Sequence, residues 1–421
     1  MLIELLKNRE VQGNPKGIYS VCTAHPFAIR AAMRQALSNC SPLLIEATSN
    51  QVNQFGGYSG LRPRDFRTLV ENLADEEKFP VSRLILGGDH LGPNPWQHES
   101  ADRAMTLAEE LIKEYANAGF EKLHLDASMP CADDSQPLSP KVIASRSARL
   151  CAAAEKVSAE KRFLYVIGTE VPTPGGAKEA IQSLHLTQVS DAEATLTLHR
   201  QAFNERGLES ALDRVIAIVV QPGVEFNHDS VYDYNSDDTK ALQKWLSLHS
   251  PLVFEAHSTD YQKPNAYREL VKDGFAILKV GPAVTFAMRE ALFALAEIER
   301  ELIDRNHQSR LMEVIERAMI TSPMNWKSHY HGGLEEQRLL RRFSYSDRIR
   351  YYWNEPEVRA SVDLMIKNLR TTDIPETLLS AHMLEQYHAL REGVLVKDPI
   401  ELTLHATQQS LRHYAEACCL P

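Results

Sequence analysis

The sequence predicts a single (β/α)8 barrel with a mostly helical C-terminal extension. Eight short apolar segments, each ending in polar or charged residues, recur along the first two thirds of the 421-residue chain. Segments with helical spacing separate them, a pattern typical of buried parallel strands in βα units. After about Glu301 the strand-like runs stop, and the sequence becomes rich in Arg, Tyr, His and Leu. We therefore expect a barrel over residues 1–305 and a helical extension, packed on the barrel, over residues 306–421.

The eight predicted strands, separated by helical segments, suggest a closed barrel. In chain order they are IYSVC (18–22), LLIEATS (43–49), LILGGDH (84–90), KLHLDAS (122–128), LYVIGTE (164–170), VIAIVVQP (215–222), VFEAHST (253–259) and AILKVGP (276–282). The intervening segment Ala101–Ala118 has helical spacing and ends at Gly119, a good helix stop. An open doubly wound sheet could use the same strands in another order. The strand count favours the barrel.

Composition argues against several classes of function. Hydrophobic residues make up 43% and charged residues 24% of the chain, which is ordinary for a globular protein with a large core. The formal net charge of -10 argues against nucleic acid or an anionic membrane as a partner, because both favour a basic surface. The six cysteines lack metal-site spacing, the first ten residues lack a signal-peptide core, and no apolar run has membrane-span length. We expect a cytoplasmic protein.

Polar side chains follow nearly every predicted strand. In barrels of this kind the reactive groups collect at the carboxyl ends of the strands. The residues at those ends are Glu46, Thr48, Asp89, His90, Asp126, Ser128, Glu170, Gln221, His257, Asp260 and Lys279. A barrel without a site would rarely place charged or metal-binding side chains at so many of these positions. We therefore expect the functional site at this end.

Imidazole and carboxylate groups among these residues predict a divalent metal site, most simply zinc. We select His90, Glu170 and His257 as ligands, because this donor combination suits zinc and related ions. Glu225 and His228 are further candidates. Any one of these histidines alone is more simply a hydrogen-bonded loop residue, so the prediction depends on their convergence.

The same strand ends supply candidates for proton transfer. A metal would polarise a ketone and stabilise an enediolate while Asp89, beside His90, moves a proton. Asp126 and Glu46 are the other carboxylates that we assign to catalysis. Together these groups predict retro-aldol chemistry.

His124 and Lys279 each allow two interpretations. Strand alternation places His124 on the same face as Asp126, so it either points into the barrel near the site or is a hydrogen-bonded core residue. A desolvated Lys279 could attack a ketone to form a Schiff base. An ion pair or a phosphate contact is the simpler role for Lys279.

A phosphate site is expected where the last predicted strand meets the next helix. Gly281 allows close backbone approach there, and the helix amino terminus offers free N–H groups. The other residues that we select for substrate or phosphate binding are Lys279, Ser258, Asn50 and Arg348. Asn50 lies in the segment Ser49–Gly60 (SNQVNQFGGYSG), which is either a sugar-binding loop or a structural Ω-loop.

Eight motifs resemble the GatZ/KbaZ family, the Z subunits of D-tagatose-1,6-bisphosphate aldolase. They are IEATSNQVNQFGGYSG, LGGDHLGPNPWQ, KLHLDASM, YVIGTEVPTPGG, VVQPGVEFNH, FEAHSTDYQ, ILKVGPA and SYSDRIRYYW. The resemblance runs from about Ile18 to at least Trp353. The segment SHYHGG before the last motif favours the KbaZ branch, associated with galactosamine and N-acetylgalactosamine use, over the galactitol-linked GatZ branch.

The resemblance implies two alternative functions. Z subunits support the activity and stability of a separate catalytic Y subunit, so it implies a class II aldolase of the Y type as the partner and a phosphorylated ketohexose as the substrate. Related members are associated with 4-epimerisation of tagatose 6-phosphate and fructose 6-phosphate, which implies a metal-dependent epimerase working by retro-aldol chemistry. No P-loop or kinase motif is present in the sequence.

The resemblance also extends to the class II aldolases at single positions. Asp89 and His90 resemble the acid and ligand pair of those enzymes, and His257 resembles a later ligand. Gln221 stands where a further histidine would be expected at the end of the sixth strand.

Overall fold

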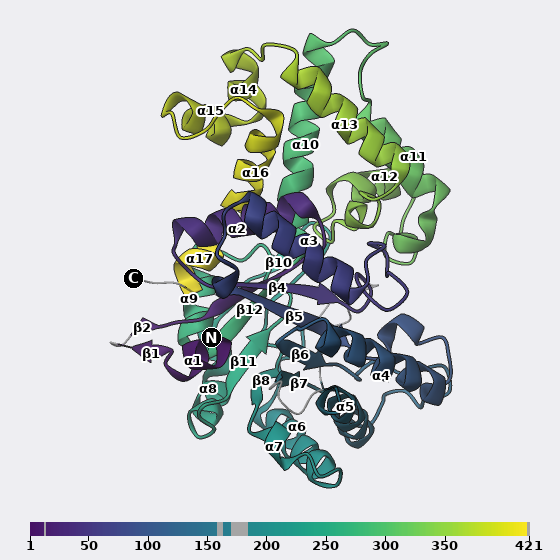
Figure 1. Cartoon of the computed structure of the whole chain (residues 1–421), viewed down its shortest axis with the longest axis vertical. Coiled ribbons are helices and arrows are strands. Elements are labelled where there is room, and N and C mark those ends of the chain that lie inside the picture. Colours follow the sequence, from purple (N-terminus) through teal and green to yellow (C-terminus); the bar gives the residue numbers. More distant parts are fainter. Residues whose placement is uncertain (12–13, 158–162, 170–183, 419–421) are drawn as a thin grey trace.

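Eight parallel strands form a closed barrel, as the sequence predicts (Figure 1). In chain order they are β3 (Ile18–Cys22), β4 (Leu43–Thr48), β5 (Leu84–Leu91), β6 (Lys122–Leu125), β7 (Leu164–Ile167), β8 (Val215–Val219), β11 (Val253–Ala256) and β12 (Phe275–Val280). This computed structural model describes residues 1–11, 14–157, 163–169 and 184–418. Each barrel strand pairs with the next one, and β12 pairs with β3 to close the ring. The closed ring rules out the open sheet.

The predicted strands begin within one residue of the observed ones, whereas several end earlier than predicted. The largest differences, three residues each, are at β6, β7, β8 and β11, which end at Leu125, Ile167, Val219 and Ala256. The polar residues that follow these strands belong to loops, because their side chains make local hydrogen bonds in place of ladder bonds. Ser128, for example, donates both its backbone N–H and its hydroxyl to Asp126 Oδ1, at 3.0 and 2.6 Å.

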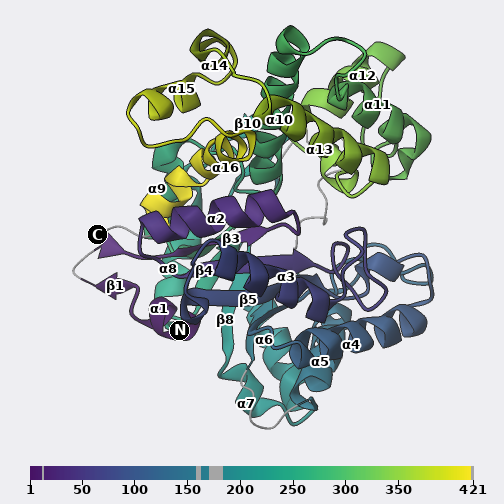
Figure 2. The ribbon, with the colours of Figure 1, turned by 45° about the horizontal axis from the view of Figure 1, so that its top comes forward.

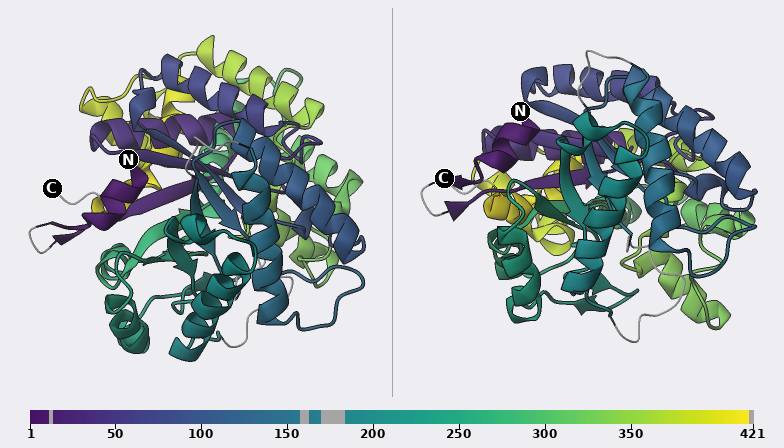
Figure 3. Two further views of the ribbon diagram at one scale, coloured as in Figure 1. Left: turned by 60° about the horizontal axis from the view of Figure 1, so that its bottom comes forward. Right: turned by 90° about the horizontal axis from the view of Figure 1, so that it is seen from below.

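Helices cover the outside of the barrel (Figures 1 and 3). They are α2 (Pro26–Ser38), α3 (Pro63–Glu76), α4 (Ala101–Asn117), α5 (Pro140–Glu155), α6 (Val189–Asn204), α7 (Glu209–Leu212), α8 (Lys240–Ser247) and α9 (Pro264–Lys272). The next helix, α10 (Pro282–Leu302), begins at the barrel and extends away from it. Gly119 follows α4 with a φ of 82°, the left-handed conformation that ends a helix. The predicted stop is therefore confirmed.

Short elements lie between the barrel strands and helices. They are α1 (Leu2–Lys7), the strand pairs β1 (Glu10–Val11) with β2 (Asn14–Pro15) and β9 (Glu225–Phe226) with β10 (Val231–Tyr232), and the 3-10 turns η1 (Val81–Arg83), η2 (Asn94–Trp96) and η3 (Ser236–Thr239). Two further 3-10 turns, η4 (Pro323–Asn325) and η5 (Arg348–Tyr351), belong to the C-terminal extension.

The C-terminal extension is helical in its described residues, as predicted (Figures 1 and 2). Its helices are α11 (Leu311–Thr321), α12 (Leu334–Phe343), α13 (Pro356–Arg370), α14 (Glu376–His382), α15 (Leu384–Arg391), α16 (Pro399–Gln409) and α17 (Arg412–Cys418). The long helix α10 projects from the barrel and shares a second hydrophobic core with α11, α13 and α14. Among the described helices, none is both long and apolar enough to cross a membrane.

The last helix returns to the barrel. Helix α17 packs against α9 and β3, and its residues Tyr414, Ala415 and Cys418 belong to the core between the strands and their helices. Because α10 leaves the barrel surface after β12, α17 covers part of the wall beside β3 (Figure 1). The division at residue 305 stays a proposal, and this packing favours counting α17 with the barrel.

The interior of the barrel has an apolar half and a charged half. Near the amino-terminal ends of the strands, Ile18, Leu44, Ile85 and Ile277 cluster with two leucines of α1. Two residues further along β4 and β12, on the same face of each strand, stand Glu46 and Lys279. The strand alternation that fills one end with a packed core therefore delivers charged groups to the other end.

Candidate metal centre at the barrel mouth

Seven ionisable side chains from five strands meet inside the carboxyl-terminal half of the barrel. They are Glu46 of β4, Asp89 of β5, Lys122 and His124 of β6, Glu255 of β11, His257 directly after β11, and Lys279 of β12. None of them is more than 5% exposed. Buried charges are tolerated only when they are paired or bind an ion, so each needs a partner.

Two lysines connect the carboxylates of this network. Lys122 Nζ lies 2.6 Å from Glu46 Oε1 and 2.8 Å from Glu255 Oε2. Lys279 Nζ contacts Glu46 Oε2 and lies 3.0 Å from Asp89 Oδ1. Glu46 fits only because residue 87 is glycine: a Cβ there would lie 2.3 Å from Glu46 Oε1. Lys279 is thus ion-paired, which is the simpler of its two interpretations.

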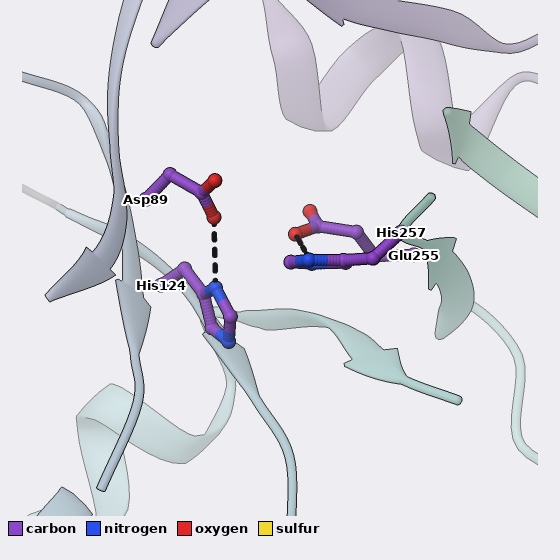
Figure 4. Close-up of side chains that lie close together, drawn as sticks. All are labelled: Asp89, His124, Glu255 and His257. Atoms are coloured by element: carbon purple, nitrogen blue, oxygen red, sulfur yellow. Dashed lines mark hydrogen bonds and ion pairs between the residues drawn. The ribbon is translucent and has the colours of Figure 1, made fainter. Parts of the chain in front are cut away.

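Four of the seven residues form a candidate metal-binding cluster, Asp89, His124, Glu255 and His257. Their possible ligand atoms all lie within 4.8 Å of one another. Figure 4 shows Asp89 and His124 on one side, facing Glu255 and His257 on the other. His124 Nδ1 lies 3.0 Å from Asp89 Oδ1, and His257 Nε2 lies 3.0 Å from Glu255 Oε1.

The donor set of the cluster suits a divalent transition metal. Two imidazoles with two carboxylates are a combination that zinc and related ions bind. His124 Nε2 is buried and has no hydrogen-bond partner. Orphaned buried polar atoms are rare in folded proteins, so His124 keeps a ring nitrogen that no described group binds. The residues present therefore fit a metal.

The charge of the network also favours a cation. Four buried carboxylates, those of Glu46, Asp89, Asp126 and Glu255, face two lysine ammonium groups, so the excess negative charge is two with every imidazole neutral and one with His90 protonated. An uncompensated charge is expensive to bury. A divalent cation would balance this excess.

His90 lies beside the cluster and pairs with Asp126. Its Nδ1 is 2.7 Å from Asp126 Oδ2, and its ring centroid lies 4.9 Å from that of His257 and 5.2 Å from that of His124. Burial opposes protonation of His90, but the nearby carboxylates of Asp89 and Asp126 outweigh burial and raise its pKa. Burial likewise raises the pKa of Asp126, yet its bond to His90 outweighs burial and holds the pKa below its usual range.

The residues predicted as metal ligands do not all belong to the four-residue cluster. His257 belongs to the four-residue cluster, His90 lies next to it, and Glu170 lies outside the described residues. His228 is held by Ser344 Oγ at 2.9 Å and by the carbonyl oxygen of residue 329 at 3.1 Å, away from the cluster. Burial raises the pKa of Glu225, also outside the cluster, to about 7.

Gln221 has a local structural partner. Its Oε1 accepts hydrogen bonds from the backbone N–H groups of Gly223 and Val224, at 2.9 and 3.1 Å. The side chain therefore shapes the loop after β8.

A pocket opens at the carboxyl ends of the strands, next to the cluster. Its lining residues are Cys22, Thr48, Asn50, Gln51, Tyr58, Asp89, His90, Phe226, His257, Ser258, Asp260, Lys279, Val280, Gly281, Pro282, Arg350 and Tyr351. Four predicted substrate-binding residues, Asn50, Ser258, Lys279 and Gly281, are among them. Arg348 does not line the pocket: it is buried, and its Nε donates to the carbonyl oxygen of Asn325.

The backbone at Gly281 already binds a carboxylate. The N–H groups of Gly281 and Ala283, at the start of α10, donate to Asp260 Oδ1 at 3.1 and 2.8 Å. Burial raises the pKa of Asp260 to about 6, against the effect of these two bonds. Two of the N–H groups that could hold a phosphate are therefore satisfied within the chain.

Lys122 and Glu255 of the network and Arg350 of the pocket are among the residues that were not selected from the sequence. Lys122 and Glu255 precede His124 and His257 by two positions, so the period-two alternation of a strand could have identified both. Arg350 follows Arg348 by two positions, and only the path of η5 distinguishes them.

Comparison with known proteins identifies the family. The family model described as D-tagatose-1,6-bisphosphate aldolase subunit GatZ/KbaZ-like matches residues 2–419. The chain belongs to this family. A GatZ subunit of this aldolase from Salmonella dublin is 53% identical over 414 residues, 98% of each chain. Another, from Klebsiella pneumoniae, is 53% identical over 413 residues, 97% of each chain.

A solved structure agrees with both the family and the fold. The crystal structure titled a probable tagatose 6 phosphate kinase from Sinorhizobium meliloti 1021 has a TM-score of 0.89 and 48% identity, covering 96% of this chain and all of that one. The predicted GatZ/KbaZ-like membership is thereby confirmed. The preference for the KbaZ branch stays a prediction, because the family model spans both branches and the relatives named above are GatZ chains.

Proposed function

We propose that this chain is a Z subunit of a D-tagatose-1,6-bisphosphate aldolase in the cytoplasm and that it works with a catalytic Y subunit. Identity of 53% to a GatZ chain along 98% of both lengths supports the subunit role. We further propose that its barrel mouth binds a divalent metal, most simply zinc, and a phosphorylated ketohexose. The buried cluster of two imidazoles and two carboxylates is the observation that carries this second part.

The residues around the pocket have complementary roles in this proposal. A bound metal would polarise the ketone of the sugar. Asp89 belongs to the cluster and also lines the pocket. An ionised Asp89 can accept a proton from a sugar hydroxyl, while protonated His90, held by Asp126, can return one. Glu46 and Lys122 hold the neighbouring charges in place.

A second candidate function is 4-epimerisation of a ketohexose 6-phosphate by this chain alone. The observation in its favour is that cluster residues Asp89 and His257 line an open pocket within a single chain. Retro-aldol cleavage, rotation of the aldehyde and re-addition would invert carbon 4 with the same groups. The kinase name of the Sinorhizobium relative gains no support here, because the sequence has no GxxxxGK[ST] motif.

Activity assays separate the two candidates. The zinc-loaded chain is incubated with D-tagatose 6-phosphate, with and without a chelator, and separately with a Y subunit and the bisphosphate. Stimulation of Y-subunit aldolase activity, without turnover by the chain alone, is the expected result for a Z subunit. Chelator-sensitive formation of fructose 6-phosphate without the Y subunit would establish the epimerase. The absence of both activities would contradict the proposal.

The extension is the region that we expect to contact the Y subunit. Truncation from Arg341 would remove α17 and expose the barrel core, so surface substitutions are the cleaner test. On α12, Leu334 and Leu339 are 85% and 57% exposed. The double variant Leu334→Glu/Leu339→Glu should weaken co-purification with the Y subunit, whereas Leu248→Glu, at a 77% exposed position of the barrel, should not. If the double variant and Leu248→Glu co-purify with the Y subunit equally well, this face of α12 is not the contact surface.

A further inference from the structure

The C-terminal extension completes the wall of the pocket. Arg350 and Tyr351, from η5, line the pocket together with Tyr58, which comes from the loop after β4. The rings of Tyr58 and Tyr351 pack edge to face, with centroids 4.5 Å apart. Asn354 Nδ2 also donates to the carbonyl oxygen of Ser59 at 3.2 Å. The loop after β4 and the extension therefore form one continuous rim.

Arg350 carries its charge at this rim without a carboxylate partner. Its Nη1 donates to the carbonyl oxygens of Ser346 and, at 3.1 Å, Asp347, and its Nη2 donates to the Tyr351 hydroxyl at 3.1 Å. Within the described residues, no carboxylate oxygen lies within 4.0 Å of the guanidinium nitrogens. A guanidinium has five N–H donors, so capacity remains for an anion.

Two carboxyl groups that interact electrostatically with Arg350 are bound by other groups. The Asp347 carboxylate lies 3.2 Å from Arg289 Nε and accepts a hydrogen bond from the Thr285 hydroxyl at 2.6 Å. Asp260 accepts its two backbone hydrogen bonds at the start of α10. Neither carboxylate neutralises Arg350 directly. The Arg289–Asp347 pair is buried and fixes the segment from which Arg350 projects.

The rim is electropositive where the interior is electronegative. Burial would raise the pKa of Tyr351, but Arg350 and Arg348 outweigh burial and lower it. Below the rim, the four carboxylates exceed the two lysines. A ligand that fits both regions carries an anionic group at one end and oxygens for a metal at the other. A sugar phosphate has this form.

We propose that Arg350 binds the phosphate of the ketohexose, with the Tyr58 and Tyr351 rings shaping the rim around it. This inference rests on the proposed function, because it places a sugar phosphate in the same pocket. The phosphate then lies at Arg350, on the extension, and the carbonyl end of the sugar points towards Asp89 and His257. Arginine suits this role because its fork of N–H groups matches phosphate oxygens in pairs.

Calorimetric titration of the zinc-loaded full chain tests the assignment with three probes: inorganic phosphate, D-tagatose 6-phosphate and unphosphorylated D-tagatose. Arg350→Met removes the charge, Arg350→Lys restores it without the fork, and Arg338→Met is a matched control on the exposed surface of α12. We expect Arg350→Met to weaken phosphate and sugar-phosphate binding by roughly 10- to 100-fold, with partial recovery in Arg350→Lys. Tagatose binding, zinc content and the control should match wild type.

The outcomes separate this inference from the proposed function. Unchanged phosphate binding in Arg350→Met, or no phosphate binding by wild type, would overturn the inference even if zinc binding and aldolase stimulation are intact. Equal weakening of tagatose and tagatose 6-phosphate would assign Arg350 a structural role and also overturn it. Phosphate binding that depends on Arg350 in a chain without zinc or activity would support the anion site while the proposed function fails.

Discussion

The two halves of the barrel interior are built by the same strands and have opposite chemistry. The amino-terminal half is an apolar cluster that includes Leu44, Ile85 and Ile277 together with two leucines of α1. The carboxyl-terminal half, two to four residues further along, holds Glu46, Asp89 and Lys279 in a network of buried ions. Packing alone would favour apolar residues throughout, because ion pairs of this kind add little net stability.

The difference between the halves indicates which part of the barrel serves stability and which serves a ligand. An apolar half contributes through burial, and its residues can be exchanged for others of similar volume. Burying charged groups costs free energy unless each charge is balanced. The buried charges of this half therefore indicate a bound ion or substrate. Substitutions in the two halves should therefore separate unfolding free energy from metal binding.

Lys122→Met should give the largest loss of stability. It leaves Glu46 and Glu255 without their shared ammonium partner, and the removal of one member of a buried ion pair costs about 3–5 kcal/mol. Urea unfolding of the metal-free chain measures the change. Lys240→Met, at an exposed position, is the matched control. A loss below about 1 kcal/mol would show that the network is not held by Lys122.

Ile277→Ala tests the apolar half. Ile277 is fully buried in the cluster beneath the network, so we expect a loss of about 2–5 kcal/mol in unfolding free energy. Metal stoichiometry should stay at the wild-type value, since no ion-pair partner changes. A loss of metal together with stability would contradict the separation of the two halves.

Gly87→Ala tests how closely Glu46 of β4 packs against residue 87 of β5. The added Cβ would lie 2.3 Å from Glu46 Oε1, so the carboxylate must move away from Lys122. Such overpacking costs about 1–3 kcal/mol. Gly333→Ala, where an added Cβ meets nothing within 4 Å, is the control, and thermal unfolding compares the two variants. Equal stability of both would show that Glu46 is not confined.

A pH dependence from Glu255 is the last stability prediction. Burial opposes ionisation of this carboxyl, but Lys122 and His257 outweigh burial and lower its pKa to about 2. Because the folded pKa lies below the unfolded one, the contribution of Glu255 is complete above pH 4.5 and is lost as the pH falls towards 2. Metal-free Glu255→Gln should lose less stability between pH 6 and pH 3 than wild type. Parallel curves for the two would refute this.

Much of the fold could be predicted because its signals are local. Apolar runs fixed the starts of the barrel strands, and Gly119 marked the end of α4. The return of α17 to the wall beside β3 could not be predicted, because its partners lie far away in the sequence and its apolar spacing fits any helix surface. Helix periodicity indicates which face of a helix is buried, but it does not identify the element that covers that face.

The candidate site was predicted in outline only. Asp89 and His257 were found because polar residues at strand ends stand out. Lys122 and Glu255 lie inside apolar runs, and their partners come from strands across the barrel, so only the closed ring brings them together. Arg348 and Arg350 have similar sequence surroundings, yet the path of η5 buries one and places the other at the pocket.

Zinc titration of the chelator-stripped chain tests the central claim most directly. We predict one tight divalent site per chain in wild type, lost in His257→Ala and His124→Gln without unfolding, and preserved in His98→Gln, whose side chain is 72% exposed. His90→Ala should lose or weaken the site, because His90 lies beside both histidines. The account would be contradicted if wild type bound no stoichiometric zinc. It would also be contradicted if His257→Ala or His124→Gln bound zinc as tightly as wild type.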